Sequence, residues 1–127
     1  MSDYNLQQDD QLEIIRVIVH GELTKDSGYE IITAARNKAA ETGYGILYDV
    51  RNVVHRVSIA DFFFLPRKLE ALKNSPARHA RAAVVISPEI TGEYHFYENV
   101  TENVGLVFRV FLDVEEAIAW LKETKQG

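Results

Sequence analysis

The chain has 127 residues, no cysteine and a formal net charge of −5 at pH 7. This length is enough to bury a hydrophobic core in one domain without disulfides or metals. The acidic balance argues against binding to the nucleic-acid phosphate backbone, which requires a basic face. The lack of cysteine excludes disulfides, thiolate chemistry and Cys-ligated zinc. The polar, acidic N-terminus and the short apolar runs predict neither a secretory signal nor a membrane span, so we expect a cytoplasmic protein.

The first third of the chain predicts a β-hairpin followed by a helix. Residues 4–8 are typical of a short edge strand, and residues 12–19 are apolar on both alternating faces, as in the centre of a covered sheet. The short link between them favours antiparallel pairing. Thr24 is the expected N-cap of the helix and Gly43 its C-terminal glycine. A stripe of mostly small residues should let this helix approach the sheet closely: Gly28, Ile31, Ile32, Ala35 and Ala39.

The remaining segments alternate between strand and helix patterns. We expect strands over residues 45–51, 81–86 and 105–111, a turn over 52–57, and helices from Ser58, around 90–103 and from Asp113 onward. Crossovers of this length imply a mostly parallel sheet. The predicted fold is therefore α/β: one domain over residues 1–127, with a mixed, mostly parallel sheet of about five strands flanked by about four helices.

Four segments resemble the SpoIIAA-like branch of the STAS superfamily (sulfate transporter and anti-sigma factor antagonist domains). They are residues 20–24 (HGELT), 47–51 (LYDVR), 82–86 (AAVVI) and 110–121 (VFLDVEEAIAWL), which together span nearly the whole chain. The resemblance implies a STAS-like sheet with flanking helices. It also implies protein–protein switching or the binding of small ligands or lipids, rather than enzymatic activity.

The resemblance gives Ser58 a candidate role. In anti-sigma factor antagonists a serine at the start of the corresponding helix is phosphorylated by a partner kinase, and the added charge blocks docking. Here the acceptor lies in Val57-Ser58-Ile59, without the acidic residue before it or the hydroxyl after it. The alternative is structural, because Ser58 and Asp61 have the spacing of a helix capping box.

Aromatic residues outside the core stripes are the second candidate. Phe63 and Phe64 fall off the apolar stripe of their helix, and Pro66 predicts a kink that would turn one of them inward. These rings line a ligand pocket, meet a second subunit or pack under a neighbouring helix, and the sequence leaves all three open. Tyr94 and Tyr97 lie on the third helix, where adjacent aromatic positions cannot all face the core.

The turn over residues 52–57 holds the third group of candidates. His55 and Arg56 follow a strand end, where ligands gather in α/β proteins. Asp49 is two residues before Arg51, on the same side of the strand, so an ion pair is favoured over an acid–base role. The four histidines show no metal-binding spacing, and no cofactor motif is present, so we expect no metal and no cofactor.

The sequence thus favours a non-enzymatic binding or regulatory domain. We expect it to dock a protein partner or a small apolar ligand, with a homodimer as a further option. The expected contact residues are Phe63, Phe64, Tyr94, Tyr97, His55 and Arg56. The alternatives are a regulator switched by phosphorylation of Ser58 and an enzyme with a site over residues 49–56.

Overall fold

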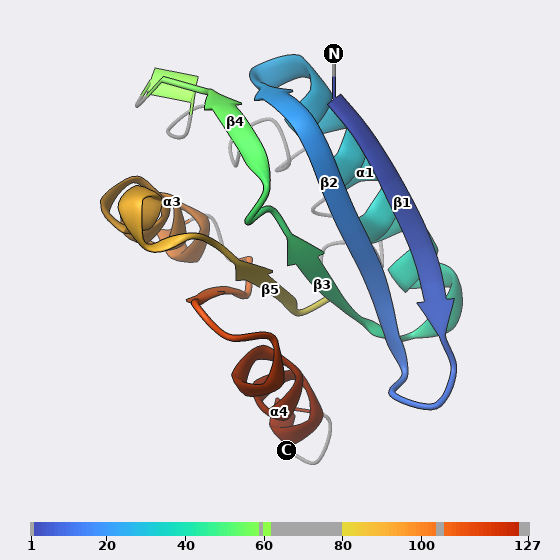
Figure 1. Ribbon diagram of the computed structural model, residues 1–127. Coiled ribbons are helices and arrows are strands. Elements are labelled where there is room, and N and C mark those ends of the chain that lie inside the picture. The colour runs from blue at the N-terminus through green and yellow to red at the C-terminus, as the bar shows by residue number, and fades with distance from the viewer. Residues whose placement is uncertain (1, 59, 62–79, 104–105, 125–127) are drawn as a thin grey trace.

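The computed structural model describes residues 2–58, 60–61, 80–103 and 106–124 (Figure 1). Its strands are β1 (Ser2–Asp9), β2 (Ile14–Thr24), β3 (Gly45–Asp49), β4 (Val53–Arg56), β5 (Ala82–Val85) and β6 (Phe108–Phe111). Its helices are α1 (Lys25–Thr42), α3 (Thr91–Asn103), which follows a 3₁₀ turn at Pro88–Ile90, and α4 (Val114–Thr124). Among the described helices, none has both the length and the apolar character to span a membrane.

The described strands form one mixed sheet with the order β1-β2-β3-β5-β6, and β4 pairs with β2 off this path. The β1–β2 pair is antiparallel and the other pairs are parallel. The predicted hairpin and the predicted α/β class with a mostly parallel sheet are both confirmed. The described part has one strand more than expected, because β4 forms from residues that we assigned to a turn.

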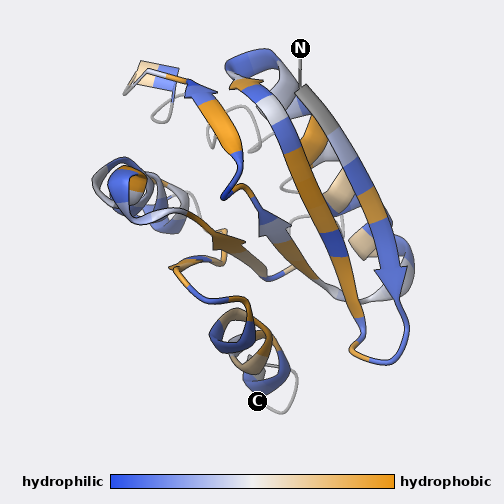
Figure 2. Cartoon of the chain, in the orientation of Figure 1, coloured by the Kyte–Doolittle hydropathy of each residue, from blue (hydrophilic) through white to orange (hydrophobic). Residues whose placement is uncertain are grey.

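Two hydrophobic clusters cover opposite faces of the sheet. One joins Ile15, Val17 and Tyr48 to buried residues of α1 and α3, and the other joins Leu47 and Val85 to α4. The alternation of neighbours such as Leu47 and Tyr48 between clusters follows from the period of two in a strand. The central strands are therefore largely apolar on both faces, and Figure 2 shows β5 and much of β2 in orange, with a blue band that interrupts β2.

Local sequence signals set both ends of α1, as expected. Thr24 Oγ1 accepts a hydrogen bond from the Ser27 backbone N–H, and Ser27 Oγ accepts one from the Thr24 N–H, which completes a capping box. Gly43 ends the helix with φ of 77°, a left-handed conformation that glycine adopts without a Cβ penalty. On the stripe between them, Gly28, Ile31, Ala35 and Ala39 are buried.

The segment over residues 52–57 corrects the sequence prediction. Val53–Arg56 is a strand that pairs with the far end of β2, which runs on to Thr24. Ile18 pairs with Asp49, and Gly21 pairs with Val53. The chain therefore advances three residues on β2 but four residues between β3 and β4, which leaves one extra residue between these two strands. The polar side chains there favoured a turn, yet the free edge of the long β2 strand offers backbone partners that an isolated segment lacks.

This register divides the sheet. β5 pairs with β3 as far as Asp49 and Val85, whereas β4 continues along β2 beyond that point. Figure 1 shows β4 diverging from β5 and from α3. Side chains from the diverging strands and from the two helices line a pocket in this region.

A pair of glycine substitutions separates backbone strain from packing. Gly43 and Gly92 both have room for a Cβ atom, since no heavy atom lies within 4 Å of the ideal Cβ position, but only Gly43 has positive φ. We expect Gly43→Ala to lower the free energy of unfolding by about 1 kcal/mol. Gly92→Ala, inside α3, should be neutral or stabilising by up to about 1 kcal/mol. Urea denaturation of both variants measures this, and equal effects would contradict it.

Candidate functional site

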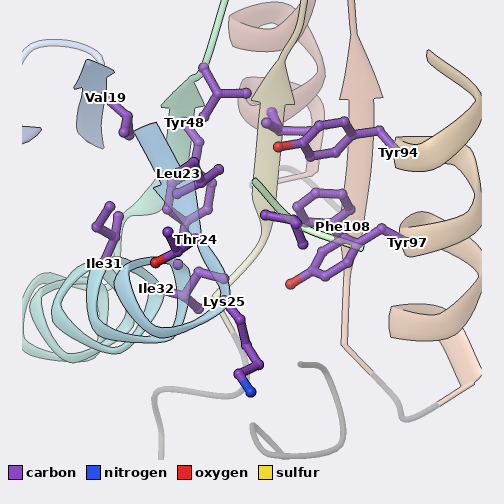
Figure 3. A pocket seen from close by; sticks show the side chains of 14 residues that line it. Val19, Leu23, Thr24, Lys25, Ile31, Ile32, Tyr48, Tyr94, Tyr97 and Phe108 are labelled. Atoms are coloured by element: carbon purple, nitrogen blue, oxygen red, sulfur yellow. The ribbon is translucent and has the colours of Figure 1, made fainter. Parts of the chain in front are cut away.

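An apolar pocket lies on the α1 and α3 side of the sheet, next to the point where the sheet divides. Val19 and Leu23 of β2 form one part of its wall, and Ile31 and Ile32 of α1 form another (Figure 3). The cavity measures about 60 Å³ and is partly open to solvent. The lining of the described residues is almost entirely apolar. Such a space favours an apolar group over a charged one.

Tyr94 and Tyr97 form the wall contributed by α3, and both rings extend from the helix toward the pocket (Figure 3). Their exposed fractions are 5% and 4%, so both rings are buried. The sequence had not decided which aromatic side chains of this helix face the core. The Tyr97 ring packs edge-on against Phe108 of β6, with ring centroids 4.8 Å apart. Burial raises the pKa of both phenols, so they stay protonated at neutral pH.

His55 connects β4 to this wall. Its Nε2 atom and the Tyr94 Oη atom share a hydrogen bond of 2.8 Å, and the two rings pack edge-on at a centroid distance of 5.4 Å. Desolvation lowers the pKa of His55, and the carboxylates of Glu93 and Glu89 oppose that shift more weakly. The two expected contact residues therefore meet each other, and together they bridge the diverging part of the sheet and α3.

Tyr48 is a pocket residue that sequence reasoning missed. Its ring comes from the central strand β3, and burial raises the pKa of its hydroxyl to about 12. That hydroxyl is buried and has no hydrogen-bond partner among the residues that the structure describes. The positive charge of the buried Arg36 guanidinium opposes this rise in the pKa of Tyr48. The Nη1 atom of Arg36 donates a hydrogen bond of 3.1 Å to the Ala80 carbonyl oxygen. In the sequence Tyr48 stood inside an apolar run, which predicted ordinary core packing.

The polar candidates near the strand ends do not converge on one site. Arg51 binds the Asp49 carboxylate with two side-chain hydrogen bonds of 2.9 and 2.7 Å, which confirms the predicted ion pair and lowers the pKa of Asp49. Arg56 lies 3.6 Å from Glu22, and both side chains are largely exposed. His55 instead packs against Tyr94. No group of three potential metal ligands occurs within the described ranges.

Ser58 is engaged as a helix cap. Its Oγ atom accepts from the Asp61 backbone N–H at 3.1 Å, and the Asp61 carboxylate accepts from the Ser58 N–H at 3.0 Å. This reciprocal pair confirms the predicted capping box. The Asp61 carboxylate beside the hydroxyl would repel an added phosphate, so the geometry favours the structural role. Phe63 and Phe64 lie outside the described residues.

Comparison with known proteins identifies the fold. No protein-family model and no curated protein sequence matches the chain. Among solved structures, it is similar to an uncharacterised DUF3478-family protein with a SpoIIAA-like fold from Shewanella loihica PV-4, with 17% identity over 94% of this chain and 93% of that one and a TM-score of 0.57. It is also similar to the unphosphorylated form of the anti-sigma factor antagonist SpoIIAA, with 18% identity over 94% and 98% of the two chains and a TM-score of 0.51.

The chain is thus an α/β protein with a mixed sheet and helices on both faces. More narrowly, it has a SpoIIAA-like fold, as its sequence motifs predicted. At these identities the likeness establishes the architecture alone, because one fold can carry many functions.

A pair of tyrosine substitutions tests the polar groups at the pocket. Tyr48→Phe removes a buried hydroxyl without a partner in the described structure, so the free energy of unfolding should stay unchanged or rise. Tyr94→Phe removes the partner of His55 and should cost about 1 kcal/mol. Urea denaturation without any ligand measures both, and a clear loss of stability in Tyr48→Phe would show that its hydroxyl is bonded in solution.

The lowered pKa of His55 predicts a pH dependence of stability. At pH values between the lowered pKa of His55 in the folded state and its ordinary value of 6.5, His55 is protonated in the unfolded chain but neutral in the folded protein. The stability contribution of His55 is therefore complete above about pH 7 and declines as the pH falls through this window. His55→Gln should flatten the melting temperature measured from pH 8 to pH 5, while the control His20→Gln, the same change at an exposed position of β2, should leave the slope unchanged. Identical slopes in both variants would refute the assignment.

Proposed function

We propose that this protein is a non-enzymatic binding domain that holds a small apolar ligand in the pocket between α1 and α3. The observation that supports this most directly is the pocket itself, an apolar and partly open cavity bounded by both helices and the sheet. Binding sites for small molecules commonly combine such a concave apolar wall with a few polar groups. The polar groups here are the phenols of α3 and β3, and the phenol of Tyr94 is hydrogen-bonded to His55.

The size of the cavity defines the ligand. A water molecule needs about 10–15 Å³ on the scale used for protein cavities, so 60 Å³ admits several heavy atoms. The ligand is thus a small apolar molecule, or the end of a longer apolar chain that enters from the open side. Among the described lining residues the one cation is Lys25, which is exposed, so the buried part of the ligand is uncharged.

A polar rim lies beside the apolar wall. Thr24 and Lys25, at the start of α1, belong to the lining, and the Lys25 side chain leads away from the apolar residues (Figure 3). Lys25 is exposed and can hold its ammonium group in water while its methylene groups contact apolar surface. An occupant that extends out of the cavity would therefore meet a polar environment at this end.

Three alternatives have less support. Docking of a protein partner through Phe63 and Phe64 depends on residues outside the described part of the chain. An enzyme with a site over residues 49–56 would need Asp49, His55 and Arg56 to converge, and each has a different partner. A switch at Ser58 has to overcome the neighbouring Asp61 carboxylate. The apolar pocket is therefore the best-supported binding site among the described residues.

The test is a titration with xenon and with cyclopentane, followed by the backbone amide signals in NMR spectra. Both probes are uncharged and apolar, and apolar protein cavities bind such molecules. We expect saturable shifts at amides of β2 and α1 that border the pocket. In Ile32→Phe, a larger ring at a half-buried pocket position should weaken binding about tenfold, which corresponds to ~1.4 kcal/mol.

A matched control is available on the opposite face of the sheet. Ile118 of α4 is also half-buried and packs in the second cluster, so Ile118→Phe makes the same change away from the pocket. It should leave the affinity for both probes unchanged. Shifts that never saturate, or equal affinities in the two variants, would rule out this pocket as the binding site.

A further inference from the structure

The strands at the two ends of the β1-β2-β3-β5-β6 order differ in how well their outer edges are protected against pairing with another chain. At the β6 edge, Glu98 Oε2 of α3 accepts a hydrogen bond of 2.8 Å from the Val110 backbone N–H. The carbonyls of Val107 and Phe111 accept hydrogen bonds from the β5 side, so the intervening Val110 N–H points outward. This edge is also only four residues long. A short strand with one of its outward donors occupied is a poor template for another chain.

The β1 edge has none of these protections within the described residues. β1 is eight residues long and pairs with β2 in one unbroken register, from Ser2 with Gly21 to Asp9 with Ile14. It contains no proline, lysine or arginine, and the constant register shows no bulge. No described element pairs with its outer side, which borders open space in Figure 1. Natural sheets protect long edges with those very devices, because a free row of backbone N–H and C=O groups recruits another strand.

The side chains of β1 determine which strand fits. Tyr4 and Leu6 lie against the α1-side cluster and remain partly exposed, while Asn5 and Gln7 are exposed. An antiparallel pair of identical β1 strands with Asn5 on the two-fold axis places Tyr4 of each copy opposite Leu6 of the other. Cross-strand pairs of aromatic and aliphatic residues stabilise a sheet. In this register the acidic positions 3 and 9 do not face each other, so no like charges oppose across the pair.

We propose that the β1 edge is a self-association surface, on which a second copy of this chain pairs antiparallel about a two-fold axis at Asn5 to make one continuous sheet. A symmetric pair of this kind needs no surface other than the strand itself. The interface is small, so the association is weak and depends on concentration. It is independent of the ligand pocket, which lies on the far side of β2.

A charge-swap experiment tests the proposal. Asn5 is exposed, so Asn5→Asp and Asn5→Lys are compatible with the fold, and each places two like charges opposite each other on the axis. Sedimentation equilibrium from roughly 10 µM to roughly 1 mM, a range suited to a small interface, should show dimerisation of the native chain. Each variant should raise the dissociation constant at least about threefold, and an equimolar mixture of the two should restore or exceed native association.

Gln11 supplies the matched control. It is exposed and lies in the turn after β1, so Gln11→Asp and Gln11→Lys change the net charge equally but away from the axis. These variants should associate like the native chain, and circular dichroism verifies that all four are folded. A native chain that stays monomeric up to ~1 mM, or a dimer equally sensitive at both positions, overturns the proposal. So does a mixture of the two Asn5 variants that remains monomeric, since a partner other than a second copy would then be required.

Discussion

The backbone pairing of β2 is the constraint on which the rest of the structure depends. This strand runs from Ile14 to Thr24, and on one side it pairs with β1, while on the other it pairs first with β3 and then with β4. Buried backbone donors and acceptors must be satisfied, so a strand longer than its neighbour requires a second partner. The residues after β3 supply that partner. The extra residue between the two pairings lets β4 follow β2 while β5 and β6 end.

The pocket is a consequence of this division. Where β4 leaves the path of β5, α1 and α3 no longer cover a continuous sheet, and the side chains of Tyr94, Tyr97 and Leu23 surround the remaining space. The hydrogen bond between His55 and Tyr94 joins the diverging strand to α3. A histidine whose pKa is lowered by burial and a tyrosine hydroxyl without a described partner both lie beside this space. Polar groups that cost free energy when buried are commonly found at binding sites.

The sequence predicted the elements whose signals are local. The caps of α1 at Thr24 and Gly43, the hairpin of β1 and β2 and the cap at Ser58 all depend on residues within a few positions of each other. The ion pair of Asp49 and Arg51 was predicted for the same reason, since residues two apart in a strand share a side. The prediction for residues 52–57 was wrong, because β4 is stabilised by the distant edge of β2 rather than by its own side chains.

The resemblance of four segments to SpoIIAA-like proteins indicated the architecture. The sequence by itself also determined the α/β class, the order of most elements and the ends of the first helix. These features are set by hydrophobic periodicity and by capping residues, which act over one or two turns of chain. Only the tertiary structure decided that Tyr94 and Tyr97 face inward, that His55 meets Tyr94 across 39 positions, and that Tyr48 lies in the wall of a pocket. Those placements depend on the angle at which helices cross a divided sheet, and residue spacing along the chain does not encode that angle.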